Sequence, residues 1–234
     1  FGAENTSFAI RGFTQELRTT ASVGTYFAEV VAPRGANAQT SGDGAGPGSF
    51  FDLQNVQVLK GPQGTLFGRN TTGGAVLITP RRPTDEFEGY FRVSNEFEDD
   101  ELAIEGAVSG SLTDRVRYRI AARSRDADGY YENLTLNSDE AEREDFTIRA
   151  QIEADLSDSL TALLKIESSE FDVVGRNGEI IGEIPAAAGP FTGLTFSDVL
   201  VRAFGSDPSA LDNTLNDKRS SNGDNSFNQS DTYA

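Results

Sequence analysis

The stretch "VQVLKGPQGTLFGRNTTGGAVLITP" (residues 56–80) places five glycines between two runs of aliphatic residues. Aliphatic runs bounded by Gly, Pro and Asn are typical of strands, and the glycines between them allow tight packing or turns with positive φ. A phosphate-binding loop would need the pattern G-x-x-x-x-G-K-[ST], and a dinucleotide-binding fold would need G-x-G-x-x-G. Neither pattern occurs in this stretch, which therefore predicts packed strands and turns rather than a nucleotide site.

The composition of the 234-residue chain excludes several kinds of chemistry. It contains no Cys, His, Met or Trp, which removes disulfides, thiol nucleophiles, histidine acid–base catalysis and zinc or iron–sulfur centres. We therefore expect no metal, no cofactor and no enzyme activity. The formal net charge of −17 argues against nucleic acid as a partner, because phosphate contacts need clustered Lys and Arg.

The sequence around this stretch has the same character over residues 1–83. "SFAIRGF" (7–13) and "VGTYFAEVV" (23–31) favour further strands, and residues 32–49 have the composition of a loop. "PRRP" (80–83) ends the segment, because two prolines cannot join an interior ladder of hydrogen bonds. We expect a first domain at residues 1–83.

From residue 87 onward apolar and polar residues alternate with a period of two, which predicts two-faced strands. Five such strands are expected, at residues 87–97, 102–112, 116–125, 146–156 and 160–167. No apolar run approaches the ~20 residues of a membrane-spanning helix, whereas strands of a membrane barrel need only ~9–11 residues each. Strand length and the charge-rich second faces favour such a barrel, and a soluble β-sandwich is the alternative.

The connections and the expected register support this interpretation. The turns at residues 113–115 and 157–159 are tight, whereas residues 98–101 and 126–145 and everything past Phe171 form longer, polar connections, the asymmetry of outer-membrane barrels. Pairing Leu112 with Val116 sets Glu105 opposite Arg123, and pairing Leu156 with Leu160 sets Arg149 opposite Glu167. These four charges are expected on the lumen face. A short helix is expected at residues 195–205, and a sixth strand near the end of the chain.

At this point a family resemblance becomes specific. "SFAIRGF", "VGTYFAEVV" and "FFDLQNVQVLKGPQGTLFGRNTTGGAVLITPRRP" (50–83) resemble the plug domain of TonB-dependent outer-membrane receptors. The resemblance implies a transmembrane β-barrel with an α+β plug domain. Residues 1–83 would be the plug without its N-terminal part. Residues 84–234 would be the first about five strands of a 22-stranded antiparallel barrel, with a long external loop at about 172–229.

The resemblance also implies roles for individual residues. Arg11 and Lys60 correspond to the cations that latch the plug to glutamates on later barrel strands, and Lys60 replaces the usual Arg, which makes a point contact of a bidentate one. Ligand contact is implied for Gln15, Glu16, Leu17 and Arg18, and for part of residues 34–49. The glycines expected to serve plug packing are Gly12, Gly61, Gly64, Gly68, Gly73 and Gly74.

The implied function is ligand-gated import across the outer membrane of a Gram-negative bacterium. The ligand in this family is most often a ferric siderophore, and the partners are TonB, which grips a segment expected before Phe1, and the outer-membrane lipid. We therefore expect a fragment of a larger receptor, truncated at both ends. The alternatives are a receptor that binds or signals without importing, and an importer of cobalamin, sugar or nickel complexes. An enzyme is the weakest hypothesis, because no nucleophile–base pair or metal cluster is visible.

Overall fold

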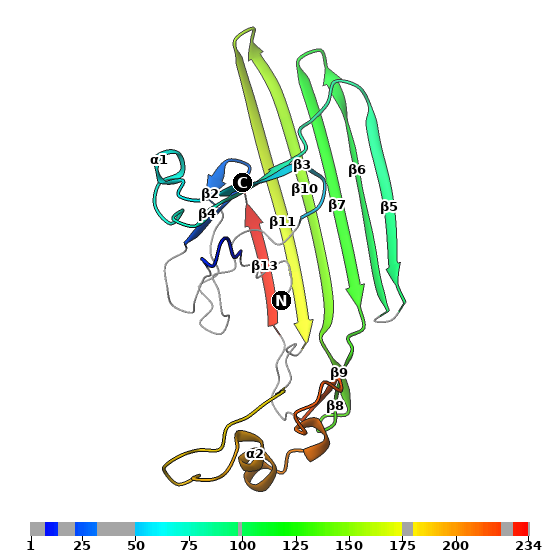
Figure 1. Cartoon of the computed structure of the whole chain (residues 1–234). Helices are drawn as coiled ribbons and strands as arrows, with labels where there is room; N and C mark the ends of the chain where they lie inside the picture. Colours follow the sequence, from blue (N-terminus) through cyan, green and yellow to red (C-terminus); the bar gives the residue numbers. More distant parts are fainter. Residues whose placement is uncertain are drawn as a thin grey trace.

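The computed structural model of the chain describes residues 8–13, 22–31, 50–97, 100–174, 180–220 and 227–233. Its strands form a four-stranded sheet, which we call the plug sheet after the resemblance above, a six-stranded sheet, which we call the wall, and a three-stranded sheet at one end. Figure 1 shows the wall as long strands lying side by side, with the plug sheet against one of its faces.

The plug sheet has the strand order β2-β1-β4-β3. Its strands are β1 (Val23–Phe27), β2 (Val30–Val31), β3 (Leu53–Lys60) and β4 (Gly74–Pro80). β1 and β4 are parallel, β3 and β4 are antiparallel, and the one-turn helix α1 (Gly64–Phe67) lies between β3 and β4 in the chain. The buried core consists of Ile10, Val23, Phe27, Val76 and Ile78.

The strand expected at residues 7–13 is wrong over its described part. Ile10 and Phe13 instead exchange both backbone hydrogen bonds, at 3.1 and 3.0 Å, across a tight turn. The two residues of this turn, Arg11 and Gly12, have φ of 52° and 80°. Two consecutive residues in the left-handed region reverse the chain and cannot continue a strand.

The wall is antiparallel throughout, with the order β13-β11-β10-β7-β6-β5. Its strands are β5 (Glu88–Glu96), β6 (Glu101–Thr113), β7 (Val116–Ala127), β10 (Glu142–Ser157), β11 (Leu160–Val174) and β13 (Phe227–Tyr233). The expected strands are all present, and β13 confirms the sixth.

The register of the wall is confirmed along the ladders but not at the turns. Glu105 pairs with Arg123, and Arg149 pairs with Glu167. Leu112 does not pair with Val116, and Leu156 does not pair with Leu160; the partners are Thr113 and Ser157, after a one-residue shift in each hairpin. A β-bulge beside each tight turn produces this shift, because it inserts one extra residue into one strand.

Two connections hold more structure than expected. The connection at residues 126–145 contains the hairpin β8 (Tyr131–Asn133) and β9 (Ser138–Glu140), and β10 begins at Glu142 rather than at residue 146. β11 continues to Val174, beyond the expected end at residue 167. Within residues 180–220 lie the expected helix α2 (Phe196–Phe204), a 3-10 turn η2 (Pro208–Ala210) and β12 (Lys218–Arg219), which pairs with β8.

The two faces of the wall have inverted polarity relative to a soluble protein. The face against the plug sheet carries buried polar side chains, among them Arg119, Thr147, Arg149, Gln151 and Glu167. The opposite face carries the aliphatic residues, whose exposed fractions on β6, β7, β10 and β11 include 37% at Ile104 and 62% at Leu112. An apolar face of this size without a protein cover indicates an interaction surface.

Among the described residues, no helix is both long enough and apolar enough to span a bilayer.

Candidate functional site: the contact between plug sheet and wall

The residues immediately before β3 bring the plug sheet into contact with the wall. Phe51 is buried and packs against Ala107 of β6 and Ala121 of β7, with Tyr90 of β5 beside them. The small side chains of Ala107 and Ala121 leave room for the aromatic ring at this contact. The backbone of the plug sheet is thus brought close to the polar face of the wall.

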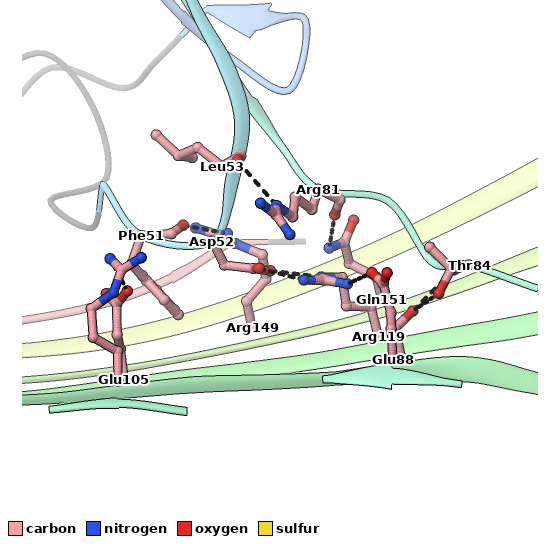
Figure 2. Close-up of polar contacts among 12 residues, drawn as sticks. Phe51, Asp52, Leu53, Arg81, Thr84, Glu88, Glu105, Arg119, Arg149 and Gln151 are labelled. Atoms are coloured by element: carbon pink, nitrogen blue, oxygen red, sulfur yellow. Dashed lines mark hydrogen bonds and ion pairs between the residues drawn. The ribbon is translucent and has the colours of Figure 1, made fainter. Parts of the chain in front are cut away.

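The next residue, Asp52, forms a buried ion pair with Arg119 of β7. The Arg119 Nε and Nη2 atoms donate to the two carboxylate oxygens of Asp52 at 2.8 and 2.5 Å, a bidentate contact that Figure 2 shows. The side chains of Asp52 and Arg119 are 0% and 2% exposed. The Arg119 Nη1 atom also donates to Glu88 of β5 at 2.9 Å. Planar guanidinium and carboxylate groups match in this geometry, which fixes orientation as well as charge.

Arg149 of β10 makes a second buried connection. Its Nε atom donates to Glu167 of β11 at 2.6 Å, both side chains are 0% exposed, and its Nη1 atom donates to the backbone oxygen of Phe51 at 3.2 Å. The guanidinium carbon lies 4.9 Å from the ring centre of Phe51 and 5.2 Å from that of Phe27. The pair expected within the wall therefore also holds two aromatic rings of the plug sheet by cation–π contacts.

The connection from β4 to β5 continues this contact along the wall. The Gln151 side-chain nitrogen donates to the backbone oxygen of Arg81 at 2.8 Å, and the Thr84 backbone nitrogen donates to the hydroxyl of Ser109 at 2.9 Å. Figure 2 shows Arg81, Gln151 and Thr84 beside the Asp52–Arg119 pair. Side chains of β6 and β10 thus satisfy backbone groups of a segment that has no ladder of its own.

A cavity of about 470 Å³ opens beside Asp52, between the plug sheet and β5 and β6. Charged and aromatic side chains line it, including Asp52, Arg81, Tyr90, Arg92 and Glu105. The carboxylate of Glu105 accepts a hydrogen bond from Arg92 of β5 at 2.7 Å. Glu105 lies opposite Arg123 of β7 in the ladder, as expected, but its ion pair is with Arg92 of β5.

The residues expected to latch the plug lie elsewhere. Arg11 and Lys60 are both exposed, and no ion pair joins either of them to a carboxylate within the described ranges. Their role as a latch remains a prediction. Gln15, Glu16, Leu17 and Arg18, and residues 34–49, lie outside the described residues.

The glycines fall into three groups. A Cβ on Gly73 would lie 2.5 Å from Cβ of Phe13, and one on Gly74 would lie 2.4 Å from the backbone oxygen of Leu59, so these two positions pack tightly. Gly12, Gly61 and Gly68 have φ of 80°, 95° and 74° and serve turns. At Gly64 neither a positive φ nor a near atom requires glycine.

Three important residues, Phe51, Asp52 and Arg119, were not predicted as a site. One signal was available: four arginines share one face of residues 116–125, and a buried guanidinium needs a carboxylate partner. Asp52 stands between two phenylalanines and an apolar strand, where a solvated aspartate has little reason to be. Nothing in the sequence, however, joins the two.

Comparison with known proteins gives the same picture. Residues 1–75 match the family model described as "TonB-dependent Receptor Plug Domain". The chain is 27% identical over 81 residues to the ferrioxamine receptor of Yersinia enterocolitica, covering 35% of this chain and 11% of that receptor. It is 32% identical over 78 residues to the pesticin receptor of Yersinia pestis, covering 33% and 10%. It is 27% identical over 137 residues to the ferric-pyoverdine 358 receptor of Pseudomonas putida, covering 56% and 16%.

Solved structures resemble a longer part of the chain. The pyoverdine outer membrane receptor FpvA of Pseudomonas aeruginosa PAO1, bound to pyoverdine, has a TM-score of 0.57 and 22% identity, covering 72% of this chain and 22% of that one. The ferric yersiniabactin uptake receptor FyuA of Yersinia pestis has a TM-score of 0.63 and 19% identity, covering 74% and 26%. The chain spans between a tenth and a sixth of the length of the curated relatives named above. The family-model match identifies residues 1–75 as a TonB-dependent receptor plug domain, and the similarity of fold to outer-membrane receptors extends over 72–74% of the chain.

Proposed function

We propose that this chain is the plug and the first part of the barrel wall of an outer-membrane importer for ferric siderophores, gated by its ligand and energised by TonB. One observation carries the proposal: the wall buries its polar face under the plug sheet and leaves its apolar face uncovered. A soluble sandwich would bury the apolar face instead. Strands of a membrane barrel place apolar residues toward lipid and polar residues toward the lumen, which matches the two faces of the wall.

The edges of the wall support its place in a larger barrel. β5 and β13 are the outer strands of the sheet, and an unpaired strand edge in lipid leaves backbone groups without hydrogen bonds. We propose that further strands continue from both edges to close a 22-stranded barrel, and that the plug domain ends and the barrel begins near residue 83.

The two ends of the wall support an orientation. The turns after β6 and β10 are two residues long, whereas the connections after β7 and β11 lie together at the opposite end and carry β8, β9 and α2 (Figure 1). Outer-membrane barrels place short turns in the periplasm and long loops outside. We propose the same orientation, with residues 180–220 external.

The nature of the ligand rests on the relatives. Two of them are named as receptors for ferrioxamine and for ferric pyoverdine, and both ligands are iron chelates. The family consists of receptors, so the mechanism that we propose is differential binding followed by movement of the plug, without covalent chemistry.

Iron uptake in a strain that lacks the gene tests this function. Radioactive iron carried by ferrioxamine B or by ferric pyoverdine is offered to the deletion strain and to the strain complemented with the full-length receptor. We expect uptake of one chelate to fall to background in the deletion strain and to return on complementation, and a TonB deletion to abolish it. Unchanged uptake of both chelates, together with loss of ligand-induced transcription, would instead indicate a signalling receptor.

A further inference from the structure

Asp52 is held in an unusual backbone conformation for a non-glycine residue. Its φ is 50°, in the left-handed region, where an aspartate costs more than a glycine and less than most other residues. The backbone oxygen of Asp52 accepts a hydrogen bond from the Arg81 nitrogen at 3.0 Å. The conformation therefore lets one residue bond to the plug sheet through its backbone and to the wall through its side chain.

The Asp52–Arg119 pair is buried, like Arg149–Glu167, and differs in this from the exposed ion pairs of the wall. Asp85 and Asp158, which pair with Arg117 and Arg115, have side chains that are 77% and 99% exposed, and exposed pairs contribute little to stability. Removal of the Asp52 charge, by contrast, leaves the buried Arg119 paired with Glu88, whose side chain is 48% exposed, and a buried charge that loses a partner is destabilising. A plug that separates from β7 has to break this contact, or carry Arg119 with it.

The pair also borders open space. The cavity between the plug sheet and β5 and β6 is lined by Asp52 itself and by Arg81, Arg92 and Glu105. Phe51 lines the same cavity and packs against Ala107 and Ala121. Residues 51 and 52 thus form the part of the cavity lining that contacts β6 and β7.

We propose that Asp52 is a positioning residue that clamps the plug sheet to β7 through Arg119 and keeps the gap between plug and wall closed. The clamp has the opposite polarity to the latch expected at Arg11 and Lys60, because here the plug supplies the carboxylate and the wall supplies the cation. The proposal rests on the proposed function in one respect: a gap between plug and wall opens a path across the membrane only if the wall is part of a barrel. Its test needs neither ligand nor TonB.

The substitution Asp52→Asn tests the clamp with little disturbance of the backbone. Asparagine has the shape of aspartate and tolerates the left-handed conformation equally well, so the change removes the charge and one of the two hydrogen bonds. Arg119→Lys is the second variant, since it keeps the charge and loses the planar fork. The matched control is Asp158→Asn, which removes the carboxylate of an exposed wall pair.

The measurement is the ion conductance of the purified full-length receptor in planar lipid bilayers, with protease cleavage of the plug as a second readout. We expect D52N to raise the conductance by at least about tenfold, R119K to raise it less, and D158N to leave it at the wild-type level. The heat-modifiable mobility of the barrel on gels should be the same in all four proteins. Plug cleavage should follow the conductance.

Two results would overturn the clamp. One is a D52N receptor with wild-type conductance and wild-type plug cleavage. The other is loss of the folded barrel in D52N and R119K, which would make the pair a requirement of wall folding rather than of plug placement. A D52N receptor that conducts, in a strain whose iron uptake does not depend on the gene, would uphold the clamp and refute the proposed function.

Discussion

At the scale of single residues, Gly73 and Gly74 close the plug sheet where β3 and β4 come together. Gly74 has φ of 154° and lies where a Cβ would be 2.4 Å from the Leu59 backbone oxygen and 2.8 Å from Ile10. Gly64 lies in the same glycine-rich stretch, begins α1, and has no atom within 4 Å of a Cβ position. Gly74 and Gly64 therefore form a matched pair, because glycine is required at position 74 and not at position 64.

We predict that Gly74→Ala destabilises the plug sheet by at least about 2 kcal/mol, because the methyl group meets backbone that cannot move aside and φ is unfavourable. Gly64→Ala should change the stability by no more than about 0.5 kcal/mol. Hydrogen exchange of the β3 and β4 amides in the full-length receptor measures both. Equal protection in the two variants would refute the packing role of Gly74.

Individual ion pairs also show which contacts can be predicted from the sequence and which cannot. The sequence predicts Arg149 opposite Glu167, because the apolar faces of β10 and β11 coincide only when paired residue numbers have an even sum. A slip by one residue would turn every side chain to the wrong face. The partner of Glu105 was not predictable in this way, since Arg92 and Arg123 flank it on two neighbouring strands. The Asp52–Arg119 pair joins residues 67 apart in the chain, and no local pattern specifies such a contact.

At the scale of elements, helix α2 shows how a loop segment specifies its own structure. Thr195 and Asp198 form a capping box in which the Thr195 backbone nitrogen donates to the Asp198 carboxylate at 3.0 Å and the Asp198 nitrogen donates to the Thr195 hydroxyl at 3.1 Å. Gly205 ends the helix with φ of 71°. The amphipathic pattern of residues 195–205 predicted α2, and these caps set its two ends, because caps depend on residues three or four positions apart.

We predict that the first turn of α2 loosens in acid. The hydrogen bonds from the backbone and hydroxyl of Thr195 lower the pKa of Asp198 below its ordinary value of 3.8. A lowered pKa in the folded state means that the carboxylate stabilises the helix above that value and that this contribution is lost as the pH falls through the folded-state pKa. Carbon-13 NMR of the Asp198 carboxyl group measures the titration directly.

The variant Thr195→Ala serves as the comparison for that titration. Without the hydroxyl, the pKa of Asp198 should rise toward its ordinary value, and the amide of Asp198 should lose protection. A wild-type Asp198 that titrates at or above 3.8 would contradict the capping box.

The strand ends show the opposite case to α2. At the start of β10, Glu142, Arg143, Glu144 and Asp145 are all charged, so the alternation that identifies a half-buried strand disappears, although the ladder continues through all four residues. Hydrogen bonding to β7 and β11 maintains the strand there, and this is a property of neighbours rather than of local sequence.

At the scale of the whole molecule, the wall turns its polar face toward the plug sheet and its apolar face away from it. The alternation of apolar and polar residues predicted two faces for each strand, and the structure confirms them, with the polar face buried by the plug sheet. Alternation alone cannot say which face meets protein, since a sandwich and a barrel share it. The buried polar contacts of Asp52, Arg119 and Arg149 decide this question.

Leu163 and Leu164 of β11 allow the most direct measurement of that claim. They are adjacent residues of one type on opposite faces, 40% and 56% exposed, and the chain contains no Trp. The substitutions Leu163→Trp and Leu164→Trp are made separately in the full-length receptor, which is reconstituted in lipid with brominated acyl chains. We predict that the fluorescence added at position 164 is strongly quenched and that added at position 163 is not. Equal quenching at both positions, or quenching at position 163 alone, would contradict a lipid-facing apolar wall.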